Sequence, residues 1–80
     1  MNRFEQNGEI LDRTGIESVL AVIWGPIVPV QKTGAISEYR KNENKFLILE
    51  DKDKKAYSIG YISPKLVQKL NEYSITYIRE

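Results

Sequence analysis

The chain of 80 residues contains no histidine and no cysteine. Without histidine it lacks the side chain that most often serves as a general base near neutral pH and as a metal ligand. Without cysteine it forms neither a disulfide nor a thiolate metal site, which fits a reducing compartment such as the cytoplasm. Catalysis would have to rest on a carboxylate pair or a lysine, and no spacing indicates either. We therefore expect a protein that is not an enzyme and has no catalytic residues, metal or cofactor.

Strong charge of one sign and long apolar stretches are also missing. Twelve basic and eleven acidic residues give a formal net charge of +1, so no global field favours nucleic acid as a partner. The longest apolar stretch, Val19 to Val30, is broken by Gly25, Pro26 and Pro29, whereas a membrane-spanning helix needs about 20 residues. The polar, acid-containing start is unlike a secretory signal. We expect a cytoplasmic protein that does not associate with membranes.

The length is enough for one domain, spanning residues 1–80. A chain this short buries only about 60–65% of its unfolded surface, so a homodimer is an expected source of additional burial. Asn7-Gly8 is a turn signal. Residues 1–13 are therefore expected either as a short hairpin or as a flexible N-terminal arm.

The clearest local pattern lies between Ala56 and Tyr73. Residues 57–62 alternate as in a strand, with Tyr57, Ile59 and Tyr61 on one face. Ser63 and Pro64 then supply a helix cap and a first helical residue. Apolar residues follow at helical spacing, so we predict an amphipathic helix over residues 63–73 that docks on the sheet. Those apolar residues are Leu66, Val67, Leu70 and Tyr73.

The stretch from Thr14 to Trp24 fits two patterns. Thr14-Gly15-Ile16-Glu17 matches a capping box that opens a helix, and apolar residues follow at helical spacing. Residues 19–24, however, form a continuous apolar run rich in β-branched side chains, which is typical of a strand buried on both faces. Of the two, we favour the strand.

Further strands are expected at residues 27–30, 35–40, 45–50 and 74–79. Pro29 places the first of these at a sheet edge, because it cannot donate to a ladder. Polar turns are expected at residues 31–34, 41–44 and 51–55. This order predicts an α+β, mainly β protein: a small curled antiparallel sheet or a partly open five- to six-stranded barrel, with one helix near the C-terminus before a last strand.

Aromatic and basic residues suggest a first candidate binding surface. Aromatic rings on the predicted strand at residues 57–62 lie near basic residues. Proteins that bind single-stranded nucleic acid use this combination, because bases stack on the rings and phosphates contact the cations. The more ordinary interpretation is that the face with Tyr57, Ile59 and Tyr61 forms part of the core beneath the helix. The candidate nucleic-acid-binding residues are Arg40, Lys41, Lys54, Lys55, Tyr57 and Tyr61.

A second candidate surface is the segment WGPIVPV at residues 24–30. A tryptophan beside a proline-interrupted apolar segment is typical of an exposed strip that binds a partner protein or a second copy. The alternative is ordinary core followed by a kinked edge strand. The candidate protein-interaction residues are Trp24, Pro26, Ile27 and Val28.

The segment Ile59-Gly60-Tyr61-Ile62-Ser63-Pro64, followed by Leu66-Val67-Gln68-Lys69-Leu70, resembles the end of HIRAN domains. In that family a strand ends in Val/Ile-Gly-Tyr-Ile-Pro and a short helix follows; here the proline stands one residue later. The resemblance implies a strand, turn and helix on a small modified OB-like barrel, a fold of which some members bind single-stranded DNA ends. We expect a non-enzymatic binding module. Its partner is either nucleic acid, bound weakly as a single strand, or a host protein, as in an interaction or inhibitor module of phage or mobile-element type.

Overall fold

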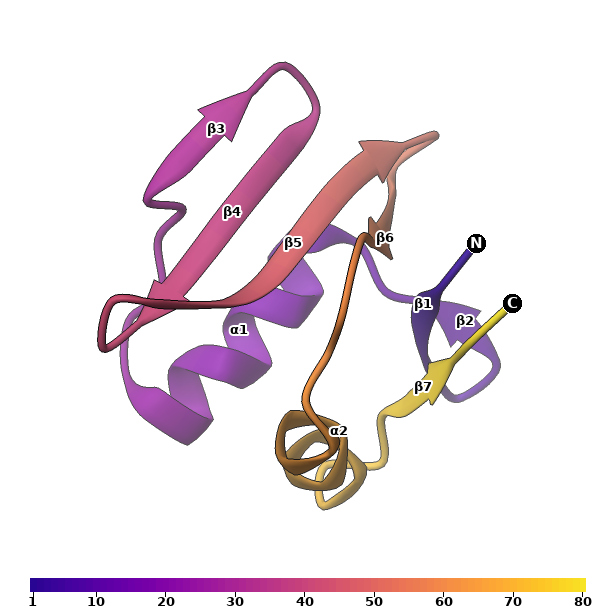
Figure 1. Cartoon of the computed structure of the whole chain (residues 1–80). Helices are drawn as coiled ribbons and strands as arrows, with labels where there is room; N and C mark the ends of the chain where they lie inside the picture. Colours follow the sequence, from indigo (N-terminus) through magenta and orange to yellow (C-terminus); the bar gives the residue numbers. More distant parts are fainter.

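The computed structural model describes all residues from Met1 to Glu80 as an antiparallel sheet of seven strands with two helices (Figure 1). The strands are β1 (Arg3–Gln6), β2 (Glu9–Ile10), β3 (Gln31–Thr33), β4 (Ile36–Lys41), β5 (Asn44–Lys52), β6 (Lys55–Ser58) and β7 (Thr76–Ile78). The helices are α1 (Arg13–Trp24) and α2 (Pro64–Asn71). The small, mainly antiparallel α+β architecture is thus confirmed.

The sheet is open and follows the order β2-β1-β6-β5-β4-β3, with β7 paired to β1. Glu5 of β1 lies opposite Ile10 of β2 on one side and opposite Thr76 of β7 on the other. The first and last strands therefore meet in the sheet, although they are far apart in sequence. Of the two predicted forms, a curled sheet or a partly open barrel, the barrel is not observed, and there are two helices where we expected one.

Helix α1 occupies the stretch for which we favoured a strand, and that prediction is wrong. Ile16 and Leu20, four residues apart, are fully buried, whereas Val22 is 68% exposed. A strand buried on both faces would have hidden Val22, while a helix buries only one stripe of its surface. The apolar run from Val19 onwards therefore combines stripe residues such as Val19 and Ile23, which pack against the core, with an exposed valine at Val22.

The ends of α1 have clear local causes. The carboxylate of Asp12 accepts a hydrogen bond of 2.7 Å from the backbone N–H of Gly15. The N-cap is therefore Asp12, and the capping box that we read at Thr14 begins two residues too late. The helix stops before Gly25, whose φ of +91° is a conformation that glycine adopts at little cost.

Helix α2 confirms the predicted cap and helix. The Ser63 hydroxyl accepts a hydrogen bond of 3.1 Å from the backbone N–H of Leu66, and Pro64 is the first helical residue. Leu66 and Leu70 are buried against the sheet. The helix is shorter than predicted, so Tyr73 lies beyond its end and is exposed.

Strands β4, β5 and β6 form a meander joined by two tight turns, as predicted. Asn42–Glu43 and Asp53–Lys54 all have positive φ between +52° and +67°, the signature of type I′ hairpin turns. Side chains of β4 and β5 alternate between core and surface. The buried ones are Ser37, Tyr39, Leu47 and Leu49.

Two of the predicted strands are displaced. Residues 27–30 form no strand, and the predicted turn at residues 31–34 contains β3 instead. Strand β6 ends at Ser58, four residues before the predicted end, because the chain bends at Gly60 with a φ of +82°. This bend leaves Ile59 and Tyr61 exposed and turns Ile62 into the core.

The N-terminal stretch forms the hairpin, which was one of our two alternatives. Strands β1 and β2 flank a turn at Asn7–Gly8, and Phe4 is fully buried. The two chain ends lie side by side (Figure 1) because the Met1 amine and Arg3 both pair with the Glu80 carboxylate, at 2.5 and 2.6 Å. The hydrogen bond from the Met1 amine has the larger effect and that from Arg3 the next largest; together they lower the pKa of Glu80 to about 2.

A single cluster of eleven buried apolar residues joins both helices to the sheet. The two helices pack against different parts of the sheet: α1 lies beneath β4 and β5, and α2 lies beside β7 (Figure 1). Neither helix is long and apolar enough to cross a membrane.

Candidate binding site: a lysine-rimmed aromatic pocket

The six residues predicted to bind nucleic acid do not form one surface. Arg40 and Lys41 end β4 beside the turn at Asn42–Glu43, whereas Lys54 and Lys55 stand at the turn between β5 and β6. Strand β5 is nine residues long and runs from one turn to the other, so roughly 25 Å separates the two pairs along the strand.

The two tyrosines of that prediction lie on the surface. Tyr61 is 79% exposed and Tyr57 is half-buried. The buried side chains of β6 are Ala56 and Ser58, on the opposite face. The interpretation that Tyr57, Ile59 and Tyr61 form a core face is therefore wrong. A bend at the end of the strand, which alternation alone did not predict, explains the exposure of Tyr61.

The two basic residues at the end of β4 have different surroundings. Arg40 forms a 2.7 Å salt bridge with Glu38, whose carboxylate also lies 3.5 Å from Lys45. The charge of Arg40 is thus already paired with the Glu38 carboxylate of the same strand. Lys41 has no acidic partner; its ammonium stands 4.2 Å from the centroid of the Trp24 ring, a cation–π contact.

Lys41 and Trp24 belong to a pocket between the end of α1, the turn after β4 and the start of α2. The cavity has a volume of about 430 Å³. The rings of Trp24 and Phe46 form its aromatic side, which we call the floor, and meet edge to face, with centroids 5.3 Å apart and an interplanar angle of 82°. We call it the lysine pocket; its lining is Trp24, Lys41, Asn42, Phe46, Ser63, Lys65, Leu66 and Lys69.

The charged side chains of the lysine pocket, which we call its rim, are all basic. Lys41, Lys65 and Lys69 all line it, no acidic side chain does, and none of the three forms a salt bridge. Three ammonium groups around an aromatic floor leave their hydrogen-bond donors available to an anion. The arrangement suits a ligand that carries both negative charge and a flat ring.

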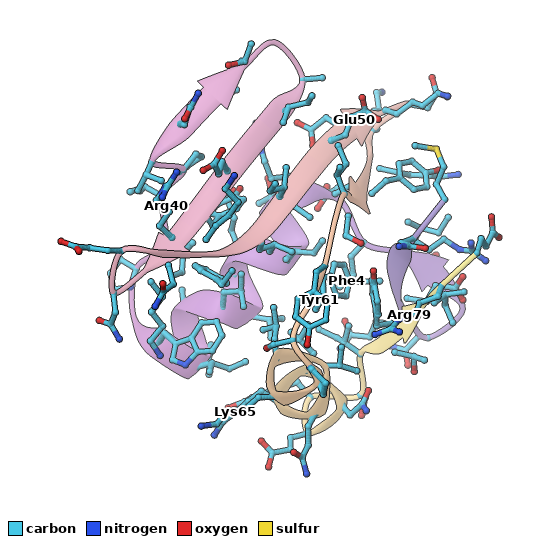
Figure 2. The ribbon with its side chains drawn as sticks, viewed as in Figure 1. Phe4, Arg40, Glu50, Tyr61, Lys65 and Arg79 are labelled. Atoms are coloured by element: carbon cyan, nitrogen blue, oxygen red, sulfur yellow. The ribbon has the colours of Figure 1, made fainter.

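Helical spacing explains how α2 supplies two of these lysines. Lys65 and Lys69 are four residues apart and so lie on the same side of the helix. Leu66 and Leu70, one position further along, face the core. Figure 2 shows Lys65 projecting from α2 towards the solvent. Sequence reasoning did not include Phe46, Lys65 and Lys69 among the site residues; the lysine pair at helical spacing was the signal that pointed to two of them.

The predicted protein-interaction strip is divided by the fold. Trp24 is partly buried and forms part of the lysine pocket, and Ile27 packs against the core. Pro26 and Val28 are exposed, Val28 by 71%. Two of the four predicted residues, Trp24 and Ile27, therefore pack against the core, and the other two, Pro26 and Val28, face solvent.

Another polar cluster lies where α1 crosses the sheet. The Tyr39 hydroxyl donates to the Glu17 carboxylate at 3.0 Å, and Arg13 lies 3.1 Å from both the Ser37 hydroxyl and the Asp51 carboxylate. Burial, and then the hydrogen bond to Glu17, raise the pKa of Tyr39, so its hydroxyl stays a neutral donor. Every member has a partner, so this cluster ties the helix to the sheet and offers no free group for chemistry.

No group of three or more acidic side chains lies close enough together to hold a metal ion. Comparison with protein-family models, curated proteins and solved structures finds no match for this chain. The resemblance of residues 59–70 to HIRAN domains therefore stays a prediction, and the argument about function rests on the pocket itself.

Proposed function

We propose that the protein is a non-enzymatic binding module for single-stranded nucleic acid, which it binds weakly in the lysine pocket. One base rests on the floor formed by Trp24 and Phe46, and the neighbouring phosphates contact Lys41, Lys65 and Lys69. The observation that carries this proposal is the aromatic floor within a rim of three unpaired lysines and no acid.

Lys41 already occupies the face of Trp24, so a base has to displace it. An exposed cation–π contact contributes about 0.5–1 kcal/mol, whereas stacking of a base on an aromatic side chain contributes about 1–3 kcal/mol. Stacking of the base on Trp24 is therefore favoured over the cation–π contact with Lys41. The displaced Lys41 ammonium can then pair with a neighbouring phosphate. The formal net charge of only +1 gives little long-range attraction, which is why we expect weak binding.

Intrinsic fluorescence provides a direct test, because Trp24 is the only tryptophan of the chain. Adding a single-stranded oligonucleotide should quench Trp24 emission with a saturable curve. The affinity should fall as salt rises, with a slope near 0.7 for each phosphate neutralised on a single strand. Unchanged emission at low salt would refute the proposal.

Two triple variants separate the pocket from general charge. Replacing Lys41, Lys65 and Lys69 by glutamine should lower the salt slope by about 2, since three phosphate contacts at 0.7 each are lost. Replacing Lys52, Lys54 and Lys55 by glutamine changes the net charge equally, at the other end of β5, and should leave the slope unchanged. Equal losses in both variants would show that binding depends on total charge and not on the pocket.

A second candidate function is a protein-interaction module, and a specific observation favours it. Val28 and Val30, in the segment that we predicted to be adhesive, are each more than half exposed, as is Val22 in the last turns of α1 just before it. A contact made by these valines would bury apolar surface and respond little to salt. Sedimentation of the purified protein at low and high salt tests self-association: a dimer that dissociates on Val28→Lys supports this second function.

A further inference from the structure

Tyr61 stands at the edge of a second, smaller hollow on the surface. The hollow has a volume of about 170 Å³ and is lined by Asn2, Gly60, Tyr61, Ile62, Tyr77 and Arg79, none of which is acidic. The Tyr61 ring is almost fully exposed. Because this ring is not buried against the core, its face is accessible to a ligand.

Tyr77 and Arg79, which also line this hollow, supply a packed ring and a cation. The Tyr77 ring packs on Phe4 with centroids 5.0 Å apart, and its hydroxyl lies 2.9 Å from the Ser58 hydroxyl. The Arg79 guanidinium lies 5.6 Å from the centroid of the Tyr77 ring and forms no salt bridge. The hollow thus combines the exposed ring of Tyr61, the packed ring of Tyr77 and the unpaired guanidinium of Arg79.

This hollow borders the lysine pocket through one short segment. Residues 60–62 line the hollow and Ser63 lines the pocket. Two residues of extended chain span at most about 7 Å, so Tyr61 lies close to the edge of the lysine pocket. Figure 2 shows Tyr61 between Lys65 and Arg79 in the same view. The two sites therefore form neighbouring parts of one face.

We infer that this face is a track for a strand of several nucleotides, with a second base stacked on Tyr61 and its phosphate held by Arg79. This inference rests on the proposed function and adds to it the class of ligand: a polynucleotide strand, not a free nucleotide. Two separate stacking rings, each with its own cations, match the alternation of base and phosphate along a single strand.

The length of the ligand tests the inference. Anisotropy of labelled thymidylates should show that the affinity rises clearly from a mononucleotide to a strand of about ten nucleotides, within the site sizes known for single-strand binders. The double variant Tyr61→Ala/Arg79→Gln should lose about tenfold on the longer strand, the equivalent of one stacked base. On a mononucleotide, which offers a single base and therefore a single stacking contact, it should lose less than about twofold by the same reasoning.

A matched control is Tyr73→Ala/Lys54→Gln, which removes another exposed tyrosine and another cation from the surface. It should bind both ligands as the native chain does. If the mononucleotide binds but length and the Tyr61/Arg79 variant have no effect, the track is overturned and the pocket stands. If neither ligand binds, the proposed function and the track fall together.

Discussion

The two ends of strand β5 have the same local structure and different surroundings. Each end is a two-residue turn in which both residues have positive φ, Asn42–Glu43 at one end and Asp53–Lys54 at the other. Lysines flank both turns. At the Asn42 end the Lys41 ammonium lies over the Trp24 ring, and Lys41 lines the same pocket as the two lysines of α2. At the Asp53 end the nearest hollow is lined by Asp12, Arg13, Thr14, Asp51 and Lys54, a mixture of charges without a ring.

This comparison teaches that basic residues at a hairpin tip do not by themselves define a binding site. The lysines at both tips carry the same charge, but acidic side chains line the hollow beside the Asp53 tip, whereas aromatic rings line the pocket beside the Asn42 tip. The difference arises from α1 and α2, whose ends meet at the Asn42 turn. The site is therefore a product of helix packing, and changes to the helices should affect the two ends of β5 unequally.

The largest effect is expected from Leu66→Ala. Leu66 is buried to 3% exposure and also lines the lysine pocket, so its truncation opens a cavity between α2 and the sheet. We expect a loss of about 2–5 kcal/mol in the free energy of unfolding, measured by urea titration with circular dichroism. Leu66→Met, which conserves volume, should cost less than about 1.5 kcal/mol. A loss below about 1 kcal/mol for the alanine variant would mean that α2 is not anchored there.

The second effect concerns the floor of the pocket. Trp24→Ala should weaken binding of a single-stranded oligonucleotide by about 5- to 150-fold, because a stacked base is worth about 1–3 kcal/mol. Trp24→Phe keeps a ring and should stay within about threefold of the native affinity. Anisotropy of a labelled oligonucleotide measures both, since these variants have no tryptophan. Native-like binding by the alanine variant would remove the Asn42 end from consideration as the site.

The sequence allowed the turns and the cap of α2 to be predicted because their causes are local. Asn7-Gly8, the polar loops beside β5 and Ser63-Pro64 each act over a few residues. Helix α1 was misread because Val19 to Trp24 satisfies the apolar requirement of both a helix stripe and a buried strand. Tertiary burial of Ile16 and Leu20, and not local preference, decides between the two.

The candidate site was predicted only in fragments, for a related reason. Trp24 and Lys41 were assigned to different surfaces, and Lys65 and Lys69 were assigned to neither. These residues lie on three elements that are distant in sequence, and only the packing of the two helices on one sheet brings them together. Arg40 was included on charge alone, although Glu38, two residues earlier on the same strand, neutralises it.

A third, smaller effect is expected where α1 is tied to β4, close to the Asn42 end. Tyr39→Phe removes the hydrogen bond to Glu17 and should cost about 0.5–1.5 kcal/mol at neutral pH. Because the fold raises the pKa of Tyr39, this residue's contribution is complete below its ordinary pKa of about 10 and is lost as pH rises further. Urea midpoints between neutral and strongly alkaline pH should therefore fall less in Tyr39→Phe than in the native chain. Tyr73→Phe, at an exposed tyrosine, serves as control; an equal effect of both variants would contradict the assignment.

The smallest effects should come from the two turns themselves, and they compare the ends of β5 most directly. Glu43→Gly and Lys54→Gly each relieve a residue that holds positive φ, at a cost of about 1–2 kcal/mol for a side chain with Cβ. The greater freedom of glycine in the unfolded chain offsets about 0.5–1 kcal/mol of that gain. Both variants should therefore be more stable by up to about 1 kcal/mol, and by similar amounts, in thermal or urea unfolding.

Their binding should differ where their stability does not. Glu43→Gly removes a negative charge beside Asn42, which lines the lysine pocket, and should raise affinity for an oligonucleotide by up to about threefold at low salt. Lys54→Gly removes a positive charge from the opposite tip and should leave affinity unchanged. A loss of affinity in Lys54→Gly equal to the gain in Glu43→Gly would mean that only net charge matters. The lysine pocket would then be no more a binding site than the charged tip at the other end of β5.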